Sequence, residues 1–164
     1  MPDTLKIAAA QYPIGEPASL AEWRDKIAGW VAEGAATGAQ LLVFPEYVTI
    51  EQAAALGPEV FSDLEATLAE VARLAGEAVA LHAELARRHN VHILAGSGPV
   101  LKADGRYVNA AQLVAPSGAV GEQEKLIMTP FEVEWGISAG GPVRVFDTAI
   151  GRFGVAICYD SEFP

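Results

Sequence analysis

Short apolar runs alternate along the chain with longer segments in which apolar residues recur every three or four positions. The runs at residues 5–11, 40–44 and 91–95 have the length of buried strands. The segments at residues 19–37 and 62–90 have the spacing of amphipathic helices. Because strands and helices alternate in this order, the pattern predicts an α/β layered fold.

Residues with strong positional preferences predict where these elements begin and end. Ser19 precedes the first helix and predicts an N-cap. Residues 62–65 (Ser-Asp-Leu-Glu) predict a capping box, with the serine as the cap, at the start of the second helix. The sequence Gly-Ser-Gly-Pro at residues 96–99 predicts the end of the third strand. Residues 46–61 are expected to form a loop, with room for one helical turn at residues 51–56.

The second half of the chain has the pattern of antiparallel strands. Residues 106–115 and 120–125 are extended segments joined by a Pro-Ser-Gly turn, which indicates a hairpin. Residues 143–148 and 152–158 predict a second hairpin. Between them lies a connection rich in Gly and Pro at residues 126–142. A connection of that length in a compact domain is usually functional or disordered.

Composition narrows the class of protein and of partner. The 164 residues include 21 Asp+Glu and 11 Lys+Arg, for a formal net charge of −10, and 51% of them are hydrophobic. The length predicts one domain over residues 1–164, and the apolar content excludes intrinsic disorder. An acidic chain without a basic run excludes nucleic acid as a partner. No membrane span or signal peptide is visible, so we expect a cytoplasmic protein without a membrane partner.

Three chemically capable residues lie at the ends of predicted strands, namely Glu46, Lys125 and Cys158. The carboxyl ends of strands are where α/β sheets place reactive groups. Together the three offer a thiol nucleophile, a carboxylate that can accept its proton, and a cation for a developing oxyanion. Taken singly, Cys158 is better interpreted as a small buried hydrophobe, and Glu46 and Lys125 as structural or solvated charges. Spacing alone does not show that they meet.

Three segments around these residues resemble the signature regions of the nitrilase superfamily, the carbon–nitrogen hydrolases. They are residues 41–46 (LLVFPE), 124–132 (EKLIMTPFE) and 154–160 (GVAICYD), in the family order Glu, Lys, Cys. The strand sequence Asn-Ala-Ala at residues 109–111 also matches, so the resemblance runs from residue 5 to the last residue. It implies a four-layer α-β-β-α sandwich. Family members continue beyond this point, so we expect the amino-terminal part of the domain, with an incomplete sandwich.

The resemblance also implies a role for each candidate. Cys158 matches the family nucleophile, Glu46 the general base, and Lys125 the residue that supports the tetrahedral intermediate. A second glutamate follows the lysine in the family. Glu132 matches that position best, and Glu134 is the alternative.

Further residues are candidates for binding the substrate. By the same resemblance, the backbone N–H of Tyr159 helps to bind the oxyanion, while Phe131 and Trp135 are candidate walls of the pocket. The implied reaction needs no metal and no cofactor. His89 and His92 lack Cys or carboxylate partners at ligand spacing and are interpreted as structural.

The resemblance therefore predicts a hydrolase that cleaves an amide, or a nitrile, of a small molecule through a Cys158 thioester. It also implies a homo-oligomer. A fragment is expected to be weakly active or inactive on its own, and a non-catalytic binding or assembly module of the same fold is the alternative. A reactive Cys158 thiol with a lowered pKa would favour the enzyme. If iodoacetamide does not label Cys158 in the folded full-length protein, the binding module is favoured instead. A redox-sensing flavodoxin-like domain is a further alternative, but no Gly-rich phosphate loop follows the first strand.

Overall fold

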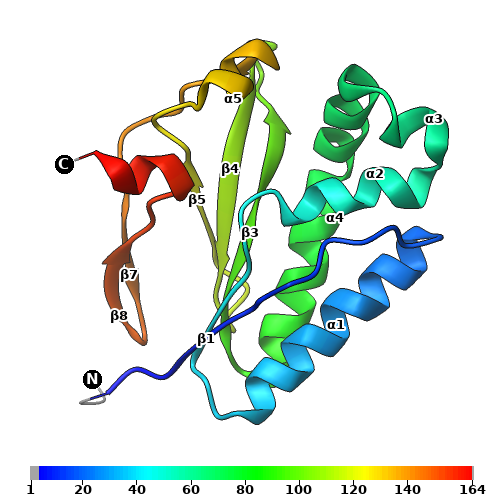
Figure 1. Cartoon of the computed structure of the whole chain (residues 1–164). Helices are drawn as coiled ribbons and strands as arrows, with labels where there is room; N and C mark the ends of the chain where they lie inside the picture. The colour runs from blue at the N-terminus through cyan, green and yellow to red at the C-terminus, as the bar shows by residue number, and fades with distance from the viewer. Residues whose placement is uncertain (1–3, 164) are drawn as a thin grey trace.

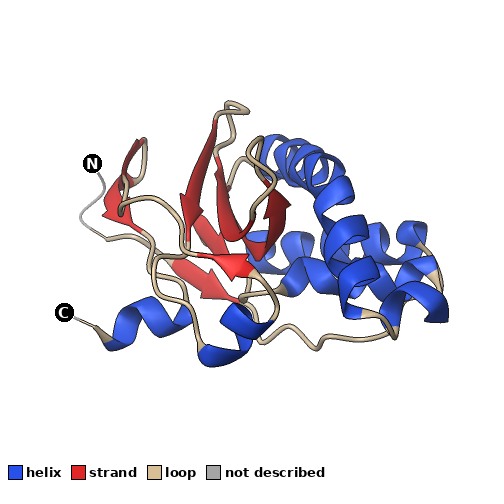
Figure 2. Ribbon diagram, turned by 90° about the horizontal axis from the view of Figure 1, so that it is seen from above, coloured by secondary structure: helices blue, strands red, loops and turns tan. Residues whose placement is uncertain are grey.

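The computed structural model describes residues 4–163, which form helices, a six-stranded sheet and a two-stranded sheet in successive layers (Figures 1 and 2). The strands of the large sheet are β1 (Ile7–Ala9), β2 (Leu41–Val43), β3 (His92–Leu101), β4 (Tyr107–Val114), β5 (Val120–Glu124) and β6 (Ile137–Ser138). Their order is β1-β2-β3-β4-β5, with β6 beside β4. The small sheet pairs β7 (Val145–Thr148) with β8 (Gly151–Gly154).

The large sheet is mixed, with three parallel and two antiparallel strand pairings. β1, β2 and β3 run parallel, whereas β4 pairs antiparallel with both β3 and β5. Parallel neighbours need long crossover connections, and the two helical segments of the sequence supply them. Antiparallel neighbours need only tight turns, which agrees with the hairpin predicted for residues 106–125. The α/β layered fold predicted from the sequence is confirmed.

Two long helices cover one face of this sheet (Figure 1). α1 (Leu20–Ala36) begins at Ser19, whose hydroxyl accepts the Glu22 N–H at 3.2 Å, so the predicted cap is confirmed. α4 (Leu64–His89) begins at Asp63, whose carboxylate accepts the Ala66 N–H at 2.8 Å. The capping box predicted on the serine at residue 62 is therefore wrong. That serine has helical backbone angles because it ends a preceding short helix.

The main core lies between these helices and the sheet. Burying one Leu or Ile side chain stabilises a fold by about 1.5–3 kcal/mol, so a shared cluster fixes both helices against the strands. The cluster includes Trp23, Ile27 and Val31 of α1, Leu81 and Leu85 of α4, Leu42 and Ile93 of the sheet, and Phe44 directly after β2.

Among the described residues, none of the helices is both apolar enough and long enough to span a bilayer.

β3 is longer than the sequence predicts. It continues through residues 96–99 to Leu101, with a register shift between Leu94 and Ser97 that marks a β-bulge. Gly96 has a φ of +73°, and a Cβ there would lie 2.3 Å from the Pro45 carbonyl oxygen. The glycine therefore admits the chain that follows β2, and it does not end the strand as predicted.

The two predicted loops contain regular structure. Residues 46–61 hold a 3₁₀ turn, η1 (Val48–Ile50), followed by α2 (Glu51–Leu56), at the place predicted for a helical turn, and α3 (Pro58–Phe61). The connection at residues 126–142 holds α5 (Pro130–Glu134) and β6. Short helices of this kind lack the long apolar periodicity on which sequence prediction depends.

The small sheet lies on the face of the large sheet opposite the helices (Figure 2). The predicted hairpin is present, but its second strand ends at Gly154, four residues earlier than expected. Beyond it, Val155 and Ile157 are buried in a second apolar cluster with Ala111 of β4. Helices, large sheet and small sheet thus match three layers of the expected four-layer sandwich, and the fold within residues 4–163 is incomplete as predicted.

Candidate active site

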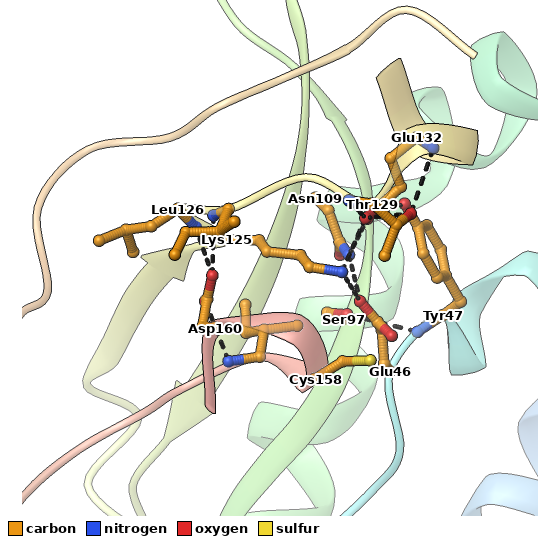
Figure 3. Close-up of polar contacts among 12 residues, drawn as sticks. Glu46, Tyr47, Ser97, Asn109, Lys125, Leu126, Thr129, Glu132, Cys158 and Asp160 are labelled. Carbon is orange, nitrogen blue, oxygen red and sulfur yellow. Dashed lines mark hydrogen bonds and ion pairs between the residues drawn. The ribbon is translucent and has the colours of Figure 1, made fainter. Parts of the chain in front are cut away.

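Glu46, Lys125 and Cys158 meet at one edge of the large sheet (Figure 3). Glu46 follows β2, Lys125 follows β5, and Cys158 is the first residue of the 3₁₀ helix η2 (Cys158–Glu162). Lys125 Nζ lies 2.7 Å from Glu46 Oε1, and the Cys158 thiol faces the same carboxylate. The structure therefore brings together the three residues that the strand ends predicted.

Glu132 completes the cluster from the other side of the lysine. Its Oε2 lies 2.7 Å from Lys125 Nζ, whereas Glu134 is exposed. α5 has a capping box in which the Thr129 N–H and hydroxyl donate to Glu132 Oε2 at 2.9 and 3.0 Å. With Pro130 at the first helical position, this short sequence turns Glu132 inward.

The ion pair of Lys125 and Glu132 is almost entirely buried, with 1% and 2% of the side chains exposed. Burial alone would lower the pKa of Lys125, but the Glu132 and Glu46 carboxylates raise it above its ordinary value. Burial alone would raise the pKa of Glu132, but hydrogen bonds from Lys125, Thr129, Tyr47 and Asn109 bring it to about 2. Both groups therefore stay charged at neutral pH.

Asn109 of β4 joins the two carboxylates. Its Nδ2 donates to Glu46 Oε1 at 2.9 Å and to Glu132 Oε1 at 3.1 Å. The sheet sets this position, because the Lys125 N–H donates to the Asn109 carbonyl oxygen at 2.8 Å and so continues the β4–β5 ladder. An amide that donates to both carboxylates offsets their mutual repulsion.

Tyr47 links the turn after Glu46 to the same cluster. Its hydroxyl donates to Glu132 Oε1 at 2.7 Å, and its backbone N–H donates to Ser97 Oγ at 3.3 Å. Burial and the Glu132 carboxylate raise the pKa of Tyr47, so it remains a neutral donor. The residue has a φ of +56°, a conformation that costs a non-glycine residue free energy and that these hydrogen bonds stabilise.

Cys158 is exposed and also has a positive φ, of +48°. A hydrogen bond to the Glu46 carboxylate, with partial burial, raises the pKa of the thiol, while Lys125 and the Tyr159 N–H act in the opposite direction. The thiol pKa is therefore raised in this arrangement, whereas a lowered pKa would have favoured the enzyme over the binding module. The thiol rests in its protonated form beside a carboxylate that can accept the proton during attack.

The family model described as carbon-nitrogen hydrolase matches residues 6–164. The chain belongs to the carbon–nitrogen hydrolase family.

Two relatives and one solved structure show how far the similarity extends. The chain is 33% identical over 161 residues to the probable hydrolase YhcX of Bacillus subtilis, covering 98% of this chain and 31% of that protein. It is 31% identical over 163 residues to a bifunctional nitrilase/nitrile hydratase of Nicotiana tabacum, covering 90% of this chain and 44% of that protein. A mutant amidase from Nesterenkonia sp. AN1, which carries acrylamide on its active-site cysteine, has a TM-score of 0.75 and 22% identity.

The match to that amidase covers 98% of this chain and 59% of that chain. This carbon–nitrogen hydrolase chain thus spans less than half the length of the two curated relatives. Family membership and the two antiparallel pairings of the large sheet exclude the flavodoxin-like alternative, whose sheet would be parallel throughout.

Of the aromatic residues predicted to bind the substrate, Trp135 packs against the cluster, whereas Tyr159 packs against another ring and Phe131 is exposed. The Trp135 ring packs edge-on against Tyr47, with 6.3 Å between centroids, and so lies beside the cluster. Tyr159 packs edge-on against Phe163 at 5.0 Å. Phe131 remains 66% exposed on α5.

Three polar residues of the site lie outside the predicted set. Asn109 had a signal, since it is one of two amide residues, with Gln112, in a strand that is mostly apolar. Asp160 accepts the Leu126 and Ile127 N–H groups, and Tyr47 reaches Glu132 (Figure 3). Neither contact leaves a pattern in the sequence, because each joins segments far apart in the chain.

Proposed function

We propose that this chain carries the catalytic centre of a hydrolase that cleaves the carbon–nitrogen bond of a small amide, with nitriles as related substrates. The reaction proceeds through a thioester on Cys158. The observation that supports this most directly is the Cys158 thiol beside the Glu46 carboxylate, which Lys125 holds at 2.7 Å. The nucleophile, the general base and the cation are therefore three different side chains that lie close enough to act on one substrate.

In the first step, Glu46 accepts the thiol proton while the Cys158 sulfur forms a bond to the amide carbon. The carbonyl π electrons move to the oxygen, which becomes an oxyanion. Lys125 Nζ and the Tyr159 N–H are the donors proposed for that oxyanion. Glu132 supports this step indirectly, because its pKa of about 2 keeps it ionised and so keeps Lys125 cationic.

In the second step, the carbonyl re-forms, the carbon–nitrogen bond breaks, and Glu46 returns its proton to the leaving nitrogen. Ammonia or an amine departs and the thioester remains. A water then gives a proton to Glu46 and adds to the thioester carbon. The sulfur leaves, takes the proton back from Glu46, and the carboxylic acid is released.

The relatives support the substrate class in this proposal. The tobacco relative is named a nitrilase/nitrile hydratase, and the Nesterenkonia protein is an amidase with acrylamide joined to its active-site cysteine. A nucleophilic thiol that must stay free suits a reducing compartment, which supports a cytoplasmic location. On the family resemblance, we also propose that residues 1–164 are part of a single carbon–nitrogen hydrolase domain and that the full-length protein is a homo-oligomer.

A panel of short amides and nitriles, assayed by ammonia release on the full-length protein that contains this chain, tests the proposal. Cys158→Ala is expected to abolish turnover, and Glu46→Gln to lower kcat by about 10²- to 10⁴-fold, because a general base contributes that much. Glu134→Gln, on an exposed neighbour of the second glutamate, is the matched control and keeps wild-type turnover. Turnover retained in Cys158→Ala contradicts the mechanism. No turnover, together with no alkylation of Cys158, indicates the binding module instead.

The same variants separate a general base from a structural carboxylate. Glu46→Gln removes the group that most raises the Cys158 pKa, so iodoacetamide alkylation should become faster at neutral pH even as turnover falls. A loss of both alkylation and turnover would argue that Glu46 only maintains the shape of the site.

A further inference from the structure

The Asp160 side chain joins two segments of the site that lie far apart in the sequence. Its Oδ1 accepts the N–H groups of Leu126 and Ile127 at 3.0 and 2.8 Å, directly after Lys125. Its Oδ2 accepts the Ile157 N–H at 3.1 Å, directly before Cys158. One half-buried carboxylate thus binds the peptide groups adjacent to both the cation and the nucleophile (Figure 3).

No strand pairing among the described residues makes this connection. Lys125 continues the large sheet, where its N–H donates to Asn109 and its carbonyl oxygen accepts the Gly140 N–H, each at 2.8 Å. Cys158 follows β8, which belongs to the small sheet. The apolar cluster between the sheets is small and non-directional, so it sets their separation more loosely than hydrogen bonds do.

A purely local role does not account for these contacts. The bond to the Ile157 N–H spans three residues and is an ordinary cap of a 3₁₀ turn. The bonds to Leu126 and Ile127 span 34 and 33 residues and add nothing to that turn. A carboxylate that accepts three N–H groups is also a strong and directional anchor.

We infer that Asp160 is a positioning residue that fixes Cys158 relative to Lys125 and Glu46. The inference rests on the proposed function, because the spacing matters only if the three side chains react together. Displacement of a reacting group by about 1 Å can cost about 100-fold in rate. Without Asp160, the turn that carries Cys158 keeps its apolar contacts and the bond from the thiol to Glu46, which are too few to hold its position, and it moves away from both charged groups.

The test uses the chain's single cysteine, so that alkylation reports on one site. Asp160→Ala, Asp160→Asn and Asp160→Glu are compared with wild type for kcat and KM on the amide panel, with kcat expressed per alkylatable thiol. The pH dependence of iodoacetamide alkylation and the thermal midpoint are measured on the same samples. The matched control is Asp104→Asn, which alters an exposed carboxylate that accepts the Arg106 N–H at 3.1 Å.

Asp160→Ala should lower kcat about 100-fold and change KM by less than about threefold. Alkylation at pH 7 should become about three- to tenfold faster, because the thiol leaves the carboxylate that most raises its pKa. Asp160→Asn keeps one accepting oxygen and should lie between wild type and Asp160→Ala. Asp160→Glu keeps the charge and should recover more kcat than Asp160→Asn.

A thermal midpoint that falls while kcat per thiol and the alkylation profile stay at wild-type values would overturn the inference, since Asp160 would then only stabilise the fold. If Asp160→Ala does not fold, Asp160→Asn decides by the same measurements. If the full-length protein that contains this chain hydrolyses no substrate, the proposed function fails, and the alkylation profiles still decide whether Asp160 holds Cys158 at the carboxylate.

Discussion

Lys125 is the most confined charge of the site, with a carboxylate on each side and 1% of its side chain exposed. A buried cation remains charged only if its partners offset the cost of leaving water. With two carboxylates and one ammonium, the cluster carries one negative charge before substrate binds. That arrangement explains why the Cys158 thiol keeps its proton at rest.

Replacing one of these partners tests the buried pair. Glu132→Gln should lower the free energy of unfolding by about 1–3 kcal/mol at pH 7, because Lys125 loses a charged acceptor. Glu134→Gln, on the exposed side of α5, should change it by less than about 0.5 kcal/mol. Urea denaturation at pH 7 measures both. Equal effects of the two substitutions would contradict the burial of the pair.

The pH dependence of stability follows from the same carboxyl group. The pKa of Glu132 falls from an ordinary value near 4.5 to about 2 on folding. A depressed carboxyl pKa adds stability that is fully present above the ordinary value and is lost as the pH falls toward 2. Wild type should therefore lose more stability between pH 5 and pH 2 than Glu132→Gln does, and parallel curves would exclude this contribution.

At the scale of elements, local signals predicted the long helices and the contacts between distant residues decided the rest. The Ser19 cap was predictable because cap and helix are adjacent. The choice between residues 62 and 63 as the N-cap of α4 was not predictable. It depends on residue 62 being the C-cap of α3. β3 continues through Gly96 because glycine has no side chain, and the Pro45 carbonyl group occupies the space where one would lie.

One buried carboxylate of α2 contacts two other segments of the chain. Glu51 is 1% exposed and accepts the Gly15 N–H at 2.7 Å, the Tyr12 hydroxyl and the Lys26 ammonium. Lys26 also lies over the Tyr12 ring, 4.3 Å from its centroid. These contacts join α2 to α1 and to the segment after β1, and α2 begins five residues after Glu46.

Glu51→Ala should lower the free energy of unfolding by about 2–3 kcal/mol, since the buried Tyr12 hydroxyl and the Gly15 N–H lose their acceptor. Glu70→Ala is the matched control, because it removes an exposed ion pair with Arg73 that contributes about 0–1 kcal/mol. Urea denaturation of both variants gives the comparison. Similar losses would mean that water or other groups replace the Glu51 contacts.

Over the whole molecule, two apolar clusters of unequal size lie on opposite faces of the large sheet. Ile93 faces the larger cluster with the helices, and Leu94 the smaller one with the small sheet. The apolar pattern of the sequence predicted which segments form strands and helices and that they alternate. It did not predict the order of the strands in the sheet. Nor did it predict that residues 155–157 pack against the large sheet, because both features depend on contacts between distant segments.

The smaller cluster should open independently of the larger one. Ile157→Ala removes one of its three buried members and should reduce hydrogen-exchange protection in β7 and β8, with α1 and α4 unchanged. Ile27→Ala, in the larger cluster, should cost about 2–5 kcal/mol and reduce protection throughout. Hydrogen exchange read by mass spectrometry separates the two. A uniform loss in Ile157→Ala would show that both sheets unfold as one unit.

The bulge in β3 limits how the site can be redesigned. A Cβ at Gly96 would meet the Pro45 carbonyl oxygen, and one at Gly98 would lie 1.8 Å from Thr49 Oγ1. A side chain at either glycine therefore displaces the segment that carries Glu46, although neither glycine takes part in the proposed chemistry. Libraries that aim at new substrate preference should leave both glycines fixed and place their diversity on exposed α5 positions such as Phe131.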